Sequence, residues 1–148
     1  MTPWIISRDT VRLIDYMKRV LGAVELACLA GKDGVIEHAE IRIGDSVVMM
    51  LDAMPERPPT PGFLRLFGED ADRVHQRAVT AGGTSVTEVT HLFFGDRVGR
   101  ARDPLGTLYW IQTCVEDLSP QEVEHRLGEP EFTKAMEYVQ SADFFPAR

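Results

Sequence analysis

Hydrophobic and polar positions in the first third of the chain follow strand spacing, then helical spacing, then strand spacing again. Residues 4–7 form a short apolar run, and Asp9 can cap a helix whose apolar side chains recur at helical spacing up to Leu21. Gly22 is expected to end that helix, since glycine readily adopts the left-handed conformation found just after helices. Three apolar or alternating runs follow between turn residues, at 24–30, 35–43 and 46–51. They predict an antiparallel meander of three strands.

The same order of elements begins again after residue 62. The pattern predicts a strand, a helix capped by Asp70, and three further strands. These strands lie at 63–67, near 85–90, at 98–102 and at 108–113. Cap, stop and turn residues recur at one offset of 61 residues: Asp9 and Asp70, Gly22 and Gly83, and Gly34 and Gly95. Recurrence at one offset indicates an internal duplication.

The predicted architecture is therefore one α+β domain made of two βαβββ modules, whose mixed sheets surround a cup, plus C-terminal helices. Module 1 covers about residues 1–54 and module 2 about 62–115, and the four prolines of residues 55–61 mark a stiff linker between them. In the tail, 116–148, Ser119 followed by Pro120 and Glu122 is a strong helix start. A second stretch places Phe132, Ala135, Met136 and Val139 on one apolar face, which must pack on the sheet's outer face or on a partner subunit.

Composition narrows the class of protein. The chain has 148 residues, 44% of them hydrophobic, which is enough to fill a core without disulfides. No apolar run reaches the roughly 18 residues of a membrane span and no signal peptide is visible, so a cytoplasmic protein without a membrane partner is expected. The net charge of -7 disfavours nucleic acid as a partner. Cys28 and Cys114 lie in apolar runs and are expected to be buried, free, non-catalytic thiols.

Three segments carry a resemblance to a known family. They are Phe94-Gly95-Asp96-Arg97-Val98-Gly99, Asp103-Pro104-Leu105-Gly106 with the later Glu116-Asp117-Leu118-Ser119-Pro120, and the segment from His38 to Ser46. Taken in their order along the chain, they resemble the vicinal oxygen chelate superfamily of glyoxalases, bleomycin-resistance proteins and ring-cleaving dioxygenases, and more narrowly its subgroup with a GDRxGxxxDPxG motif. The resemblance implies the duplicated fold above and a homodimer whose chains complete each cup. Function is left open by it, because one fold hosts many functions.

Metal-using members of that superfamily hold one divalent ion with two histidines and two carboxylates from four strands. Here those positions fall at Thr2 or Trp4, at about Met49 to Leu51, at Phe63 or Arg65, and at Trp110. None of these residues is a metal ligand of the required kind. We therefore expect no metal and no cofactor at this location.

Aromatic and methionine side chains stand where the metal ligands would be. Aromatic faces stack on planar ligands, and methionine adapts to irregular shapes. Filling the core is the competing interpretation. The predicted ligand-binding residues are Trp4, Arg42, Met50, Phe63, Arg65 and Trp110.

Polar side chains alternate along the predicted strand 35–43. His38, Glu40 and Arg42 share one face, and a histidine beside a carboxylate can act as a general base, so His38 and Glu40 are the catalytic candidates. A solvated face with a cross-strand ion pair is the alternative. His91 is expected near the rim of the cup or in a loop, and His75 and His125 on solvent-exposed helix positions.

Arg97, Arg100 and Arg102 form a basic stretch that can clasp an acidic ligand. Pairing with the flanking Asp96 and Asp103 is the preferred interpretation. Asp103-Pro104-Leu105-Gly106 itself has the residues of a type I turn.

Three classes of function follow. The first is metal-independent binding of a small hydrophobic, aromatic molecule, as drug-resistance members of the resembled superfamily do. The second is an enzyme of the isomerase, epimerase, cyclase or dioxygenase type, either metal-free through His38 and Glu40 or metal-dependent through other ligands. A structural or regulatory role for the C-terminal helices is the third.

Overall fold

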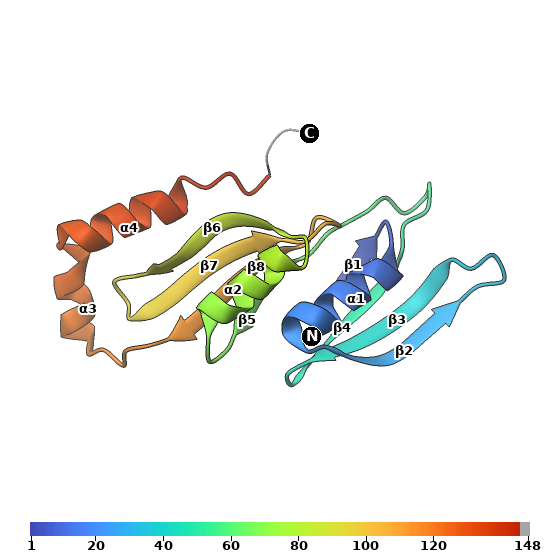
Figure 1. Ribbon diagram of the computed structural model, residues 1–148, viewed down its shortest axis with the longest axis horizontal. Coiled ribbons are helices and arrows are strands. Elements are labelled where there is room, and N and C mark those ends of the chain that lie inside the picture. The colour runs from blue at the N-terminus through green and yellow to red at the C-terminus, as the bar shows by residue number, and fades with distance from the viewer. Residues whose placement is uncertain (146–148) are drawn as a thin grey trace. The chain divides into compact units, whose positions relative to one another are not determined.

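A computed structural model describes residues 1–145 and confirms the α+β fold with two βαβββ modules and C-terminal helices (Figure 1). The first module contains β1 (Trp4–Ser7), α1 (Thr10–Leu21), β2 (Val24–Ala30), β3 (Ile36–Ile43) and β4 (Ser46–Asp52). The second contains β5 (Phe63–Phe67), α2 (Ala71–Thr80), β6 (Thr84–His91), β7 (Asp96–Arg102) and β8 (Leu108–Cys114). The tail holds α3 (Pro120–Leu127) and α4 (Pro130–Gln140).

Each module folds into a four-stranded sheet of the same topology. The strand orders are β1-β4-β3-β2 and β5-β8-β7-β6. In the first sheet β1 runs parallel to β4, while β2, β3 and β4 form the predicted antiparallel meander. By contacts between Cα atoms the chain divides into two compact units: Met1–Phe63 with Asp103–Thr107, and Leu64–Arg102 with the chain from Leu108 onward.

The duplication is visible in the caps and turns. Asp9 accepts a hydrogen bond from the Arg12 backbone N–H at 3.0 Å, and Asp70 accepts the matching bond from Arg73 at 2.9 Å. Gly34 and Gly95 both have positive φ angles, 83° and 89°, as their shared turn position requires. The helix stops differ. Gly22 caps α1 with φ 65°, whereas α2 is followed by Ala81 and then by the predicted stop Gly82-Gly83, in which Gly82 has φ 102°. The positive-φ glycine after α2 is therefore Gly82, one residue before the Gly83 that the offset of 61 pairs with Gly22.

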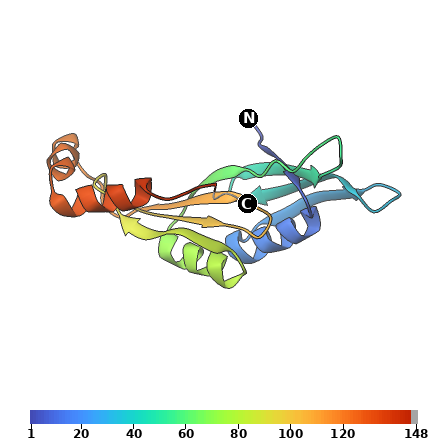
Figure 2. The ribbon, with the colours of Figure 1, turned by 90° about the horizontal axis from the view of Figure 1, so that it is seen from above.

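Helices α1 and α2 each cover one face of their own sheets, as Figure 2 shows from above. In the first unit, Leu13 and Met17 of α1 are fully buried, as are Ala39 and Ile41 of β3 and Met50 of β4. In the second unit, Ala78 and His75 of α2 are buried. A Cβ placed on Gly99 of β7 would lie 3.1 Å from the His75 ring, which identifies the α2 side of the second sheet.

The tail helices belong to the second unit. Ser119 accepts a hydrogen bond from the Glu122 N–H at 3.2 Å, which confirms the predicted start of α3. Helix α4 lies along the β6 edge of its sheet (Figure 1), where the Tyr138 hydroxyl accepts a bond from the Glu88 N–H at 2.8 Å. Val139 packs with Leu92 and Val98, joined by Phe94, Trp110, Ala135 and Met136. The apolar stripe of α4 therefore covers part of the sheet face opposite α2.

Candidate functional site

The first unit presents an open sheet face on the side away from α1. On β3, His38, Glu40 and Arg42 alternate with the buried Ala39 and Ile41 and so lie on this face. The register places Trp4 of β1 beside Met49 of β4, and Met49 beside Glu40. Trp4 is 51% exposed, so a bulky aromatic ring meets solvent next to a carboxylate.

His38 is the centre of this face. Its Nε2 lies 2.9 Å from Glu40 Oε1, and the edge of its ring meets the Trp4 ring at a centroid distance of 5.8 Å and an interplanar angle of 61°. The side chains of His38 and Glu40 are each 30% exposed, so the pair is half-buried. The predicted alternative was a cross-strand ion pair, but His38 and Glu40 are neighbours along one strand. The arrangement leaves Nδ1 as the nitrogen of His38 that can exchange a proton with a ligand.

Two other predicted residues of the first unit lie away from His38 and Trp4. Met50 is fully buried and shares a row with Ile5 and Ala39 on the α1 side, so Met49 is the methionine of the open face. Arg42 is on the open face, exposed, and its Nη1 donates to the Gly44 carbonyl at 3.2 Å. The period of two separates Met49 from Met50, but the sequence alone did not fix the register of β4.

The second unit places Arg65 and Trp110 together. Arg65 Nε donates to Gln112 Oε1 at 2.9 Å, and Trp110 Nε1 donates to the same oxygen at 2.9 Å. The guanidinium of Arg65 lies 5.9 Å from the centre of the Trp110 ring. Gln112 is buried and donates in turn to Asp96. Gln112 was missed from the sequence because a glutamine in a strand has no spacing signal. Phe63, at the start of β5, is 50% exposed.

Arg100 is a buried cation on the same sheet face. It is 3% exposed and pairs in register with Trp110 of β8 and with Thr87 of β6. Its guanidinium lies 4.3 Å from the centre of the Trp110 ring and 4.7 Å from that of Phe144, and its Nη1 donates to the Val139 carbonyl at 2.8 Å. Burial lowers the pKa of Arg100 from its ordinary value.

The basic stretch 97–102 does not make the predicted pairs with its flanking aspartates. Arg97 donates twice to Asp72 of α2, at 2.7 Å each, and Arg102 donates to the Phe144 carbonyl. Asp103 accepts from the Leu105 and Thr107 N–H groups, as expected of the turn. The prediction failed because Arg97 points to the α2 side, whereas Arg100 and Arg102 point to the opposite face, where the C-terminal segment supplies their acceptors.

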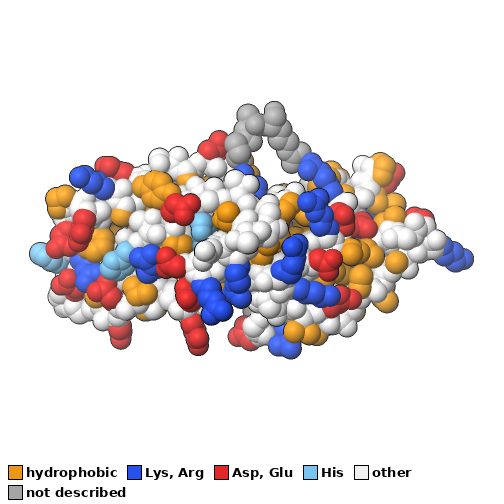
Figure 3. All heavy atoms as spheres, viewed as in Figure 1, with side chains coloured by type: hydrophobic (Ala, Val, Ile, Leu, Met, Phe, Trp, Pro, Cys, Tyr) orange, Lys and Arg blue, Asp and Glu red, His pale blue; other side chains and the backbone are white. Residues whose placement is uncertain are grey.

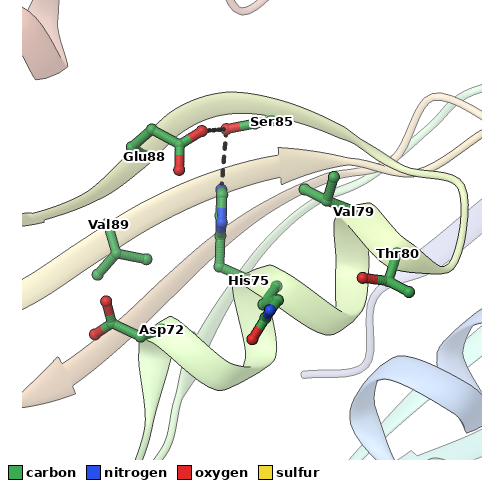
Figure 4. Close-up of a pocket in the computed structure, with 8 residues that line it drawn as sticks. Asp72, His75, Val79, Thr80, Ser85, Glu88 and Val89 are labelled. Carbon is green, nitrogen blue, oxygen red and sulfur yellow. Dashed lines mark hydrogen bonds between the residues drawn. The ribbon is translucent and has the colours of Figure 1, made fainter.

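The other three histidines differ in their exposure: His125 is exposed, His91 is partly exposed and His75 is buried. His125 is exposed, as predicted, and lies 3.3 Å from Glu129. His91 ends β6, 2.7 Å from Glu116. The exposed position predicted for His75 is wrong: the residue is 5% exposed and lines a cavity of about 410 Å³ between α2 and β6 (Figure 4).

Three side chains that line this cavity, those of His75, Ser85 and Glu88, are joined by hydrogen bonds. The Ser85 hydroxyl donates to Glu88 Oε1 at 2.7 Å and lies 3.1 Å from His75 Nε2 (Figure 4). Because a hydroxyl has one proton and an ionised carboxylate can only accept, His75 Nε2 must be the donor to Ser85. His75 is therefore oriented as a donor and not as the base of a Ser85 nucleophile.

The cysteines are free, as predicted, but their predicted burial is wrong. Cys28 is half-buried and Cys114 is exposed. Desolvation is the main cause that raises the pKa of each thiol, which disfavours the reactive thiolate.

Acidic and basic side chains are interspersed on the face shown in Figure 3. No helix within residues 1–145 is long and apolar enough to cross a membrane. Across the same residues, no three histidine, cysteine or acidic side chains gather in a way that could hold a metal ion. The side chains at the positions named by the resemblance, among them Trp4, Met49 and Trp110, do not fit a divalent ion.

Sequence comparison agrees with the two duplicated four-stranded sheets. The chain belongs to the glyoxalase/bleomycin resistance protein/dioxygenase superfamily, whose family model matches residues 4–111. The uncharacterized protein Mb0911c of Mycobacterium bovis is 30% identical over 135 residues, which cover 84% of this chain and 89% of the relative.

Solved structures show the same fold. TioX from Micromonospora sp. ML1 is 24% identical with a TM-score of 0.65, covering 77% of this chain and 97% of TioX. TnmS3, an antibiotic binding protein from Streptomyces sp. CB03234, is 20% identical with a TM-score of 0.61, covering 76% of this chain and 93% of TnmS3. The narrower subgroup suggested by the GDRxGxxxDPxG motif remains a prediction.

Proposed function

We propose that the protein binds a small hydrophobic, aromatic molecule without a metal ion. The observation that carries the proposal is that each unit holds one tryptophan on the sheet face away from its first helix, beside polar side chains. Trp4 stands next to His38 and Glu40, and Trp110 next to Arg65 and Gln112. A flat ring could stack on either indole, and each aromatic contact adds about 0.5–1.5 kcal/mol beyond burial.

Two further considerations support binding. Trp4, with half of its surface in solvent, is a large apolar side chain whose exposure a ligand would remove. The neighbour TnmS3 is described as antibiotic binding, which gives a precedent for this function on the same fold. The homodimer and the cytoplasmic location stay expectations, and light scattering on the purified protein would test the former.

The two indole N–H groups provide a direct test. The chain contains only two tryptophans, so a ¹⁵N correlation spectrum should show two indole signals, assigned with Trp4→Phe and Trp110→Phe. We expect 2-naphthamide, a neutral fused-ring probe, to shift at least one signal saturably. Cyclohexanecarboxamide, which lacks a ring to stack, is the matched control. Two signals that stay in place up to the solubility of 2-naphthamide would contradict the proposal.

A second candidate function rests on the contact between His38 and Glu40. A half-buried histidine that is hydrogen-bonded to a carboxylate can act as a general base. His38 could therefore remove a proton from the carbon next to the carbonyl group of a bound compound. If it does, 2-acetylnaphthalene in D₂O should exchange its methyl protons faster with the protein than without it, and His38→Gln should abolish the acceleration. His125→Gln is the matched control, because His125 also lies beside a glutamate but on an exposed helix. Equal rates with and without protein would exclude this candidate.

A further inference from the structure

The buried Arg100 lacks a carboxylate partner among the described residues. Its Nη1 is satisfied by the Val139 carbonyl, but its buried Nε has no hydrogen-bond acceptor. A buried charge destabilises the fold unless it is paired and hydrogen-bonded, and a buried donor without an acceptor loses the hydrogen bonds that it would make to water. The missing acceptor favours binding of a ligand with an anionic oxygen, which could accept a hydrogen bond from Arg100 Nε.

Thr87, which lies beside Arg100, also has a buried side-chain atom without a hydrogen-bond partner. It lies directly opposite Arg100 in the β6–β7 pair, is 1% exposed, and its buried Oγ1 also lacks a partner. The register of β6 shifts on both sides of Thr87, but Thr87 and Arg100 remain paired. Paired residues of antiparallel strands share a face, and in a regular ladder their Cβ atoms lie about 4.5–5.5 Å apart. One oxygen atom could therefore accept hydrogen bonds from both Arg100 and Thr87.

Phe144, in the segment that follows α4, also lies beside Arg100. The Phe144 ring lies 4.7 Å from the Arg100 guanidinium, and the Phe144 carbonyl accepts from Arg102. Arg102 is two residues after Arg100 on β7 and so lies on the same face. An aromatic ring and an acceptor oxygen, which are the two features of an aromatic acid, are thus supplied here by the protein's own tail.

We propose that Arg100 and Thr87 receive the acidic oxygen of an aromatic carboxylate or phenolate, and that Phe144 must leave its place over Arg100 to admit the ligand's ring. This inference rests on the proposed function and narrows its ligand to aromatic acids. A charge-assisted bond to a buried guanidinium gives the site its preference for the anion. Because Phe144 occupies this place in the free protein, it competes with the ligand. The apparent affinity is therefore the intrinsic affinity multiplied by the fraction of molecules in which Phe144 has moved away from Arg100.

Calorimetric titration with 2-naphthoate and with its neutral amide tests the site. We expect the wild-type protein to bind 2-naphthoate about tenfold or more tightly than 2-naphthamide. Thr87→Val should reduce affinity for 2-naphthoate about threefold or more while leaving the melting temperature equal or higher, because it removes a buried hydroxyl that has no partner. Thr113→Val is the matched control: Thr113 is also buried with an unpaired hydroxyl, but lies opposite Arg97 on the α2 side.

The tail is tested by a second pair of variants. Phe144→Ala should raise affinity for 2-naphthoate about threefold or more, whereas Phe145→Ala, at an exposed neighbour, should leave it unchanged. In the wild-type protein, 2-naphthoate should also speed hydrogen exchange of the backbone at residues 141–145. Equal binding of the acid and the amide, or a Phe144→Ala variant with unchanged or weaker affinity, would overturn this inference while aromatic binding stands. If neither compound binds, the proposed function fails and the inference fails with it.

Discussion

The two modules share a topology but differ in what covers the sheet face away from the first helix. In the first unit that face is open: Trp4 is 51% exposed and Leu29 60% exposed, and the half-buried His38 and Glu40 lie on it. In the second unit α4 and Phe144 cover part of the face, and Arg100 beneath them is 3% exposed. The duplicated elements therefore fix the framework, whereas the residues on the open faces and the added tail set the chemistry of each unit.

The largest effect should come from the turn glycines that the duplication makes equivalent. A Cβ at Gly34 would meet nothing within 4 Å, but one at Gly95 would lie 2.5 Å from the Glu116 carbonyl oxygen. Both alanine variants bear the cost of positive φ, about 1–2 kcal/mol, and Gly95→Ala adds steric strain of about 1–3 kcal/mol. Urea denaturation should show this ranking. Equal losses of unfolding free energy in Gly34→Ala and Gly95→Ala would mean that the backbone at Glu116 can move away from the added methyl group without cost.

The next effect concerns the tail, which only the second unit has. Val139→Ala removes two buried carbons from the cluster with Leu92 and Val98, and should cost about 2 kcal/mol of unfolding free energy. Val11→Ala is the control, since Val11 is a half-exposed valine on α1 and its loss should change stability by less than about 0.5 kcal/mol. A neutral Val139→Ala result would show that α4 is not held by this contact.

Acid should act on the second unit through Glu116. The Arg126 guanidinium, which contacts both carboxylate oxygens at 2.6 and 3.1 Å, lowers the pKa of Glu116 from 4.5 to about 2, with help from His91. A pKa that is lower in the folded state stabilises the fold above pH 4.5, and this contribution is lost as pH falls toward 2. Melting temperatures should therefore fall less steeply over this range in Glu116→Gln than in the wild type. Glu131→Gln, at an exposed site on α4, should keep the wild-type dependence.

The framework was predictable because it depends on local signals. The caps Asp9, Asp70 and Ser119 and the apolar periodicity each specify their own element, and the strand bounds differ from the predicted ones by two residues at most. The stop of α2 was expected at Gly82-Gly83, and only the choice between these two glycines by the offset of 61 was wrong, since Gly82 is the one with positive φ.

The candidate site was harder to predict because it depends on contacts distant in sequence. Arg100 gains its environment from Val139 and Phe144, about forty residues later, and no spacing rule joins them. Met50 was assigned to the ligand face although β4 pairing turns it toward α1. Both cases show that the alternation of a strand is visible in sequence, while the choice of its buried face is made by tertiary packing.

Binding of an aromatic molecule without a metal is the central claim, and calorimetry with and without a chelator tests it most directly. Protein freed of metal by EDTA should bind 2-naphthoate with the same affinity and stoichiometry as protein supplied with zinc, nickel, manganese or iron(II). Elemental analysis of the purified protein should find no stoichiometric metal. Binding that appears only when one of these ions is restored, together with a melting temperature that rises with its concentration, would contradict the account.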